Sequence, residues 1–334
     1  MTRITIISGF LGVGKTTFAN LLLDYYIRKG EKTAYIVNEF GKAGVDSALI
    51  AQKGFQTIDI VGGCICCTLR GKISEAVFDV VTNFSPDRIV FEPSGIFIFE
   101  KFQAIIEEPS LHDKCEIDSV ITVVDSTHAT DAMFVPGNFF ANQVAHADTL
   151  ILSKLQLYKG DALKLVERLR VLNDRAGIWA KPWDGITEED FAALDFGGSI
   201  GIGADDDDDE EEDHEHEHGH HHHDHHHHHG HHHHDEHDDD DEEEMLHEEL
   251  DSITIPVKDL DSAALDELRK LMKDGVFGNV YRAKGRVMHN GQPKLLQAVF
   301  DSLNLDDNPP DGECSLTFIG KDLSESKITE HWGK

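Results

Sequence analysis

The sequence lacks long apolar runs, scattered cysteines and an excess of positive charge, and each absence excludes a class of protein. No apolar run approaches the ~20 residues that a membrane-spanning helix needs. The 334 residues include only five cysteines, three of them within four positions, so the chain does not have the pattern of a disulfide framework. With 30 Lys and Arg against 63 Asp and Glu, no basic surface is available to neutralise nucleic-acid phosphates.

The acidic charge is concentrated in one segment. Residues 205–249 hold 23 Asp and Glu, 18 of the 23 histidines and no Lys or Arg, and the rest of the chain carries a net charge of only −10. This composition cannot build an apolar core, and it predicts a disordered insert. Imidazoles and carboxylates together bind Zn²⁺, Ni²⁺, Co²⁺ and Cu²⁺, so we predict metal sequestration, with a solvated polyacidic linker as the alternative.

The first residues are not typical of a secretory signal peptide. Gly9, Gly12 and Gly14 interrupt the apolar stretch, and Lys15 follows directly. We therefore expect a cytoplasmic protein, in which clustered thiols point to metal or redox chemistry.

Short apolar runs alternate with helical patterns over the first ~190 residues, as in α/β domains. The predicted strands are 2–8, 33–37, 58–61, 88–91, 120–124 and 149–152, and the predicted helices include 15–28, 73–81 and 160–172. This alternation is typical of a doubly wound α/β domain with a mostly parallel sheet.

Regular structure is predicted to resume after the acidic segment. Its expected elements are strands 252–257, 280–288, 295–300 and 315–319 and a helix over 262–273. We therefore predict three parts: an α/β domain over residues 1–195, the insert over 196–249, and a smaller α+β domain over 250–334.

The strongest chemical signal lies between the first strand and the first helix. Residues 9–16, GFLGVGKT, match the pattern G-x-x-x-x-G-K-[ST] of a P-loop. The glycines allow backbone N–H groups to surround phosphates, and the helix N-terminus adds its positive end. We expect Lys15 to reach the β- and γ-phosphates and Thr16 to bind Mg²⁺. The predicted nucleotide-binding residues of this loop are Gly9, Gly12, Val13, Gly14, Lys15, Thr16 and Thr17.

Three cysteines form the second signal. Cys64, Cys66 and Cys67 lie in the sequence GGCICC, close enough for their thiolates to converge on Zn²⁺, Cu⁺ or Co²⁺. Three protein ligands leave a fourth position open, which suits metal transfer better than permanent structural binding. A redox site is the alternative.

These motifs resemble the CobW-type family of P-loop GTPases, which are regarded as metallochaperones or metal insertases. The family is related more distantly to the nickel accessory GTPases of hydrogenase and urease. The matching residues are GFLGVGKT, Asn38-Glu39-Phe40-Gly41 with Asp46, GGCICC, Glu92-Pro93-Ser94-Gly95 and, in the C-terminal part, Tyr281-Arg282-Ala283-Lys284-Gly285. The resemblance covers almost everything except the acidic insert.

The resemblance implies roles for individual residues. Cys64, Cys66 and Cys67 match the family's metal motif, and Glu92 occupies its Walker B position. Gly95 is placed to sense the γ-phosphate. Glu39 is a candidate ligand of Mg²⁺ or of the cargo metal, and Asp46 is a weaker one.

One motif departs from the family pattern. Guanine is usually recognised by Asn-Lys-x-Asp after an apolar strand, but here the sequence is Ser153-Lys154-Leu155-Gln156. Gln156 offers an amide in place of the carboxylate that accepts two guanine N–H groups. Lys154 can still pack its stem against the base. We expect a preference for GTP, with ATP as the open alternative.

Together these features predict a slow GTPase that binds zinc at the three cysteines and transfers it to a metal-dependent client protein. Co²⁺ and Ni²⁺ are alternative cargoes. A histidine-rich storage protein and a P-loop enzyme with redox cysteines are the alternative functions. We expect no nucleic-acid or membrane partner and leave homo-oligomerisation open.

Overall fold

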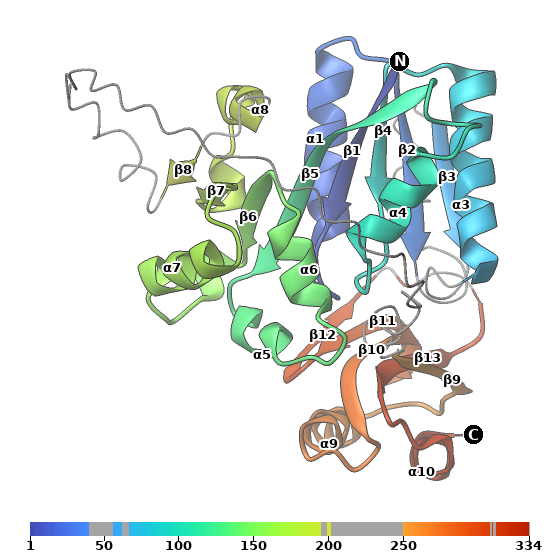
Figure 1. Cartoon of the computed structure of the whole chain (residues 1–334). Coiled ribbons are helices and arrows are strands. Elements are labelled where there is room, and N and C mark those ends of the chain that lie inside the picture. Colours follow the sequence, from blue (N-terminus) through green and yellow to red (C-terminus); the bar gives the residue numbers. More distant parts are fainter. Residues whose placement is uncertain are drawn as a thin grey trace, which may run out of the picture.

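We describe a computed structural model of the chain, which defines residues 1–39, 56–61, 67–194, 199–201, 250–307, 309 and 312–333. These residues form two sheets, each with its own helices (Figure 1). Within this part of the chain, no helix is long and apolar enough to cross a membrane.

The larger sheet has eight strands, all parallel, in the order β3-β2-β4-β1-β5-β6-β7-β8. Their bounds are β1 Thr2–Ser8, β2 Thr33–Glu39, β3 Gln56–Val61, β4 Arg88–Glu92, β5 Cys115–Asp125, β6 Thr149–Ser153, β7 Gly177–Ala180 and β8 Ile200–Gly201. Parallel strands have helices on both faces, which is why the central residues of these strands are mostly apolar.

Helices cover both faces of this sheet. They are α1 Lys15–Arg28, α3 Cys67–Asp79, α4 Phe99–Ile106, α5 Ala129–Met133, α6 Phe139–Ala145, α7 Ala162–Leu172 and α8 Glu188–Leu194, with one π-helical segment, η2 Val80–Phe84, and the short 3₁₀ segments η3 Leu155–Leu157 and η4 Trp183–Gly185. Strand residues alternate between the faces, so Ile4 and Ile6 pack with α3 and α4. Phe18 of α1 packs on the opposite face against Trp179 and against Phe191 of α8.

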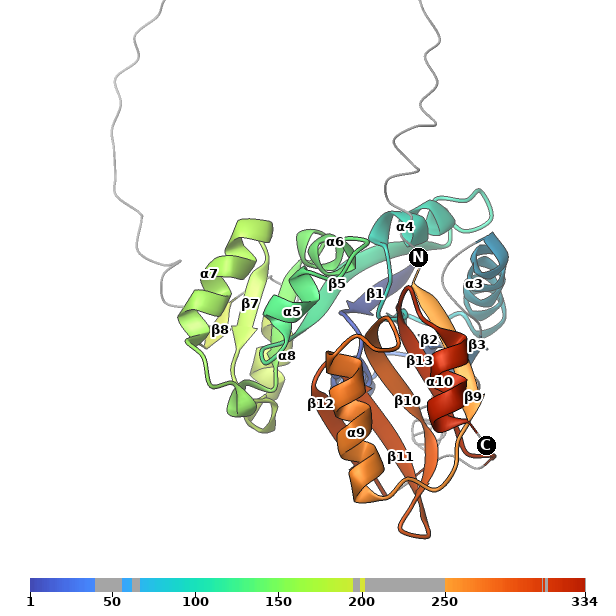
Figure 2. The same cartoon turned by 90° about the horizontal axis from the view of Figure 1, so that it is seen from below.

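The second sheet is antiparallel, in the order β12-β11-β10-β13-β9. Its strands are β9 Asp251–Pro256, β10 Asn279–His289, β11 Gln292–Val299, β12 Ser302–Asp306 and β13 Ser315–Lys321. Figure 2 shows α9 (Ser262–Lys273) and α10 (Glu325–Trp332) on one face of this sheet. Leu268 and Trp332 from these helices share a core with Phe318.

The other face of the second sheet is turned toward the larger one. Because side chains alternate along a strand, Phe318 faces the helices while Ile319 joins the core of the larger unit. Tyr281 and Phe300 pack against the same core. Figure 1 shows the second sheet beyond the carboxyl ends of β1, β2 and β4, the edge of a parallel sheet at which ligands bind.

The predicted fold class is confirmed: a parallel, doubly wound sheet of P-loop type is accompanied by a smaller α+β unit. The main differences concern element ends. Helix α3 begins at Cys67 rather than at residue 73, and Phe300 lies in a turn rather than in the predicted strand 295–300. The two-residue strand β8 extends the sheet past residue 195, and the predicted domain boundaries stay predictions.

Candidate nucleotide site

The P-loop joins β1 to α1 and depends on glycine at two close approaches. Gly9 has φ +138°, and a Cβ there would lie 2.4 Å from the carbonyl oxygen of Val123. Gly12 has φ +69°, and its Cβ would lie 2.4 Å from a methyl group of Val299. Since L-residues rarely adopt these angles, only glycine fits both positions. The loop therefore presents its backbone at the N-terminus of α1, where anions bind.

Lys15 is buried at the beginning of α1. Its Nζ donates hydrogen bonds to the carbonyl oxygens of Gly9, at 2.9 Å, and Phe10, at 3.1 Å. The ammonium group is thus held at the P-loop, where we predict it to bind the phosphates of a nucleotide.

Thr16 and Glu92 meet across the interface between α1 and β4. The Thr16 hydroxyl donates a 2.8 Å hydrogen bond to Oε1 of Glu92, and the Tyr35 hydroxyl donates to Oε2. A hydroxyl and a carboxylate are hard oxygen donors of the kind that Mg²⁺ prefers.

Buried polar groups near Thr16 and Glu92 also indicate a site for Mg²⁺ and phosphate. Neither amide atom of Asn38, at the end of β2, has a hydrogen-bond partner among the described residues. The hydroxyl of Ser94, just past Glu92, also lacks one there. Because orphaned buried polar groups are costly, a site that binds a polar ligand is expected at this edge. The residues fit a Mg²⁺-bound phosphate group.

Gly95 lies against the P-loop. A Cβ on Gly95 would come within 2.7 Å of the backbone nitrogen of Leu11, so no larger side chain fits. The carbonyl oxygen of Gly95 accepts a 3.2 Å hydrogen bond from Gln143. The segment after β4 is therefore fixed against the loop, and its role in sensing the γ-phosphate stays a prediction.

The expected base-recognition segment lies at the end of β6. Ser153 is buried, Lys154 has a left-handed backbone with φ +57°, and Gln156 is exposed in η3. Nζ of Lys154 donates to the carbonyl oxygen of Gly12, at 3.1 Å, and to Asp125, at 2.5 Å. The lysine is thus oriented beside the P-loop.

Asp125 holds that lysine from the end of β5. Its burial alone would raise the pKa of the carboxyl group, but hydrogen bonds from His128 and Lys154, together with the Lys154 charge, lower it well below the usual range. Asp125 is therefore a permanent anion at neutral pH and a fixed partner for the ammonium group.

The predicted metal ligands lie mostly outside the described residues. Cys64, Cys66 and Asp46 are outside them, as is the segment 205–249, and only the backbone is described for Glu39 and Cys67. Among the described residues, no three His, Cys, Asp or Glu side chains cluster as a metal site would require. Glu39 and Val61 are paired neighbours at the carboxyl ends of β2 and β3, and in the sequence Cys64 follows Val61 by three residues.

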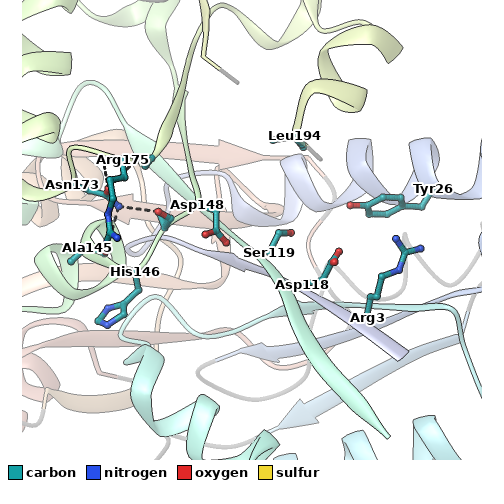
Figure 3. A pocket seen from close by; sticks show the side chains of 12 residues that line it. Arg3, Tyr26, Asp118, Ser119, Ala145, His146, Asp148, Asn173, Arg175 and Leu194 are labelled. Carbon is teal, nitrogen blue, oxygen red and sulfur yellow. Dashed lines mark hydrogen bonds between the residues drawn. The ribbon is translucent and has the colours of Figure 1, made fainter. Parts of the chain in front are cut away.

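A cavity of about 890 Å³ opens near the other end of the strands, beside the beginnings of β5 and β6 (Figure 3). Several of its polar groups already serve the fold. Asp118 accepts a 2.6 Å hydrogen bond from the buried Arg88. Asn173 donates to the carbonyl oxygens of Val144 and Ala147. We assign this cavity no part in nucleotide binding.

Comparison with known proteins bears on both sheets. Residues 3–180, more than half of the chain, match the model for the nucleotide-binding domain of CobW/HypB/UreG. The chain belongs to the CobW/HypB/UreG family. Residues 255–334 match the cobalamin synthesis protein cobW C-terminal domain, so the second sheet also has a counterpart there.

Relatives in this family carry zinc in their names. The zinc chaperone YjiA of Escherichia coli is 35% identical over 185 residues, which cover 53% of this chain and 56% of that protein. The zinc-regulated GTPase metalloprotein activator 1 of Schizosaccharomyces pombe is 28% identical over 173 residues, covering 49% and 42%. The chain thus spans about half the length of these curated relatives. The superposition on the crystal structure of Zn(II)-bound YjiA GTPase from E. coli covers 99% of this chain and 97% of that one, with 21% sequence identity and a TM-score of 0.41.

Two contacts of this CobW/HypB/UreG-type site could not be found from its motifs, and a third could. Tyr35 reaches Glu92 from the middle of β2, where its aromatic ring is typical of a buried strand. Trp183 follows the four-residue strand β7, and its ring lies 3.3 Å from where a Cβ on Gly14 would be. Asp125 did carry a signal, since it is a carboxylate directly after an apolar strand.

The Thr16–Glu92 pair makes a direct prediction. Replacing Glu92 with glutamine should raise the Mg²⁺ concentration needed for tight nucleotide binding by about tenfold or more, because such changes near a metal typically cost 10- to 100-fold in affinity. The measurement is a titration of Mg²⁺ at fixed fluorescent nucleotide. Glu188→Gln on exposed α8 is the matched control and should behave like the wild type. An unchanged Mg²⁺ requirement in Glu92→Gln would remove Glu92 from the metal site.

Proposed function

We propose that this protein is a cytoplasmic GTPase that binds a transition metal, zinc by preference, and transfers it to a client protein when GTP is hydrolysed. Cys64, Cys66 and Cys67 would bind the cargo. The observation that carries the proposal is that β1, which leads into the P-loop, and β3, which ends three residues before Cys64, have their carboxyl ends at the same edge of the larger sheet. The names of its zinc-chaperone and GTPase relatives support it.

The geometry supports nucleotide chemistry at this edge. Backbone N–H groups of the loop and Lys15 would hold the phosphates, and Thr16 with Glu92 would hold Mg²⁺, which neutralises phosphate charge when bound. Lys154 would lie against the base. Hydrolysis in such a site consists mainly of positioning and charge stabilisation, and we expect it to be slow until a client or the metal completes the site.

The strand that precedes the three cysteines ends near the proposed nucleotide site. Strand β3 is two strands away from β4, and Val37 of β2 pairs with both Asp59 and Glu92, so the backbone of Asp59 lies roughly 10 Å from that of Glu92, since neighbouring strands are ~4.8 Å apart. Val61 is two residues further along β3. Cys64 is only three residues beyond Val61. A rearrangement that accompanies loss of the γ-phosphate can therefore act on the cysteine segment over a short distance. A coupling of ~1–3 kcal/mol would suffice for useful exchange.

The test is a metal titration of protein from which residues 205–249 are deleted, so that the histidines do not mask the cysteine site. Zn²⁺ and Co²⁺ are titrated against a competing chelator without nucleotide, with Mg²⁺–GDP and with a non-hydrolysable Mg²⁺–GTP analogue. We expect one tight site per chain whose affinity changes severalfold with the nucleotide, corresponding to that coupling.

Two variants make the titration specific. Serine at Cys64, Cys66 and Cys67 should abolish the tight site, whereas Cys314→Ser should keep it. Equal affinity in all three nucleotide states would contradict the coupling and favour metal storage by the histidine-rich segment. A preference for Co²⁺ would change the cargo but not the mechanism.

A further inference from the structure

The turn between β11 and β12 rests directly on the P-loop. This turn, Val299–Ser302, is called the docking turn below. The ring of Phe300 stacks on Phe10 of the P-loop, with centroids 6.0 Å apart and planes at 18°. Val299 lies against Gly12 on the same loop. The second sheet therefore contacts the phosphate-binding segment through one short turn.

Phe300 adopts a backbone conformation that its local sequence does not favour. It is the first of two residues between the paired Val299 and Ser302, and its φ is +50°. Two-residue hairpin turns favour glycine or asparagine at such positions, and a bulky residue there is an outlier. The ring is instead held by tertiary contacts: it also stacks on His128, at 5.5 Å, and meets Tyr281 edge-on, at 6.2 Å.

A chain of polar contacts runs from the docking turn back to the P-loop. Nε2 of His128 lies 3.0 Å from Oδ1 of Asp301, and Nδ1 lies 3.3 Å from Oδ2 of Asp125. That same Asp125 oxygen accepts the hydrogen bond from Lys154, whose ammonium group also donates to the carbonyl oxygen of Gly12. The side chains of Asp301, His128, Asp125 and Lys154 thus form a chain of contacts from the docking turn to the backbone of the P-loop.

We propose that the docking turn is part of the nucleotide site, with Phe300 and Asp301 acting as positioning residues for Lys154 and the P-loop. Nucleotide binding and docking of the second sheet then stabilise each other, because binding free energies coupled through one arrangement are reciprocal. The inference rests on the proposed function only in requiring that the P-loop bind a nucleotide. It does not depend on the metal.

The coupling should depend on pH through His128. The charged groups facing this ring are Asp125 from β5, Asp301 from the docking turn, Lys154 behind Asp125, and Lys273 of α9, which acts on Asp301. The hydrogen bond with Asp125 raises the pKa of His128 above 6.5, burial opposes this, and Asp301 raises it further. When the second sheet undocks, Asp301 no longer raises the pKa of His128. The imidazole therefore binds its proton more tightly in the docked state.

The direction of the pH effect follows from that difference. Docking is stabilised at pH values below 6.5 and loses this contribution as the pH rises through the raised pKa of His128. Nucleotide affinity should fall over the same interval. Asp301→Asn removes the carboxylate that makes the pKa of His128 differ between the docked and undocked states, so the pH dependence of its affinity should be flatter than in the wild type.

The experiment measures the affinity of the full chain for fluorescent GDP and GTP analogues, and for ATP analogues in parallel, across this pH range. Phe300→Asn suits the turn conformation but lacks the ring, and Asp301→Asn lacks the charge. Both should weaken binding by about fivefold or more, in the range typical of coupled sites. Asp307→Asn, beyond the other end of β12, removes a carboxylate that binds only Lys294 among the described residues and should leave affinity unchanged.

The possible outcomes separate the role of the docking turn from the proposed function. If the wild type binds a nucleotide and both variants match it at every pH, the inference is wrong while the proposed function stands. If affinity falls but Asp301→Asn leaves the pH profile in place, the connection through His128 is wrong. If the wild type binds only adenine nucleotides, the proposed function is wrong in its nucleotide, and the variants test the docking turn with that nucleotide.

Discussion

Replacement of Lys15 by alanine is expected to reduce nucleoside triphosphate hydrolysis by about 100- to 1,000-fold, as removal of a single charge-stabilising donor does in other enzymes. The ammonium group is buried and donates to the backbone of the P-loop, where we predict the phosphates to bind. Its hydrogen bonds to the carbonyl oxygens of Gly9 and Phe10 stay within the loop between β1 and α1, so the fold should survive their loss.

The measurement is phosphate release under single-turnover conditions, with thermal unfolding to confirm the fold. Lys164→Ala is the matched control, since this lysine is exposed on α7, far along the chain from the P-loop, and should not alter the rate. Hydrolysis by Lys15→Ala at the wild-type rate would place the nucleotide chemistry elsewhere in the molecule.

Replacement of Arg88 by methionine is expected to lower the free energy of unfolding by ~3 kcal/mol, since breaking a buried ion pair strands its partners. The guanidinium group is 1% exposed. It donates hydrogen bonds to Glu31, at 2.9 Å, and to Asp118 and Thr5, both at 2.6 Å, and it lies over the ring of Tyr26.

The measurement is thermal unfolding, in which the melting temperature should fall by roughly 6–12 °C, at ~2–4 °C per kcal/mol for a unit of this size. Arg70→Met is the control, because Arg70 pairs with Glu108 at 54% exposure and exposed pairs contribute ~1 kcal/mol or less. Equal decreases in the melting temperature of the two variants would show that the buried Arg88 cluster contributes no more to stability than an exposed ion pair.

The fold could be predicted where local sequence and tertiary structure agree. The bounds of β1, α1 and α9 match the predicted 2–8, 15–28 and 262–273, since glycines, an Asp261 cap and regular apolar spacing mark them. The strands missed were short: β7 has four residues, β8 two and β12 five, so little periodicity could show in any of them.

The residues of the candidate site also fall into those that the sequence could predict and those that it could not. Lys15, Thr16 and Glu92 could be predicted because their roles follow from a local motif and a strand end. The contact between His128 and Asp301 could not, since it joins residues 173 positions apart and each looks like an isolated polar residue. Phe300 was predicted as the end of a strand because its aromatic ring favours strands, and the P-loop contact overrides that preference.

The order in which the chain is synthesised gives the docking turn a further consequence. The P-loop emerges from the ribosome first, yet Val299, which packs on Gly12, is encoded about 290 residues later. At ~5–20 residues per second, the loop waits for ~15–60 s before that partner exists. A nascent chain therefore holds an unfinished nucleotide site, and a message truncated before the docking turn yields a protein whose P-loop is present in sequence but never receives its final packing.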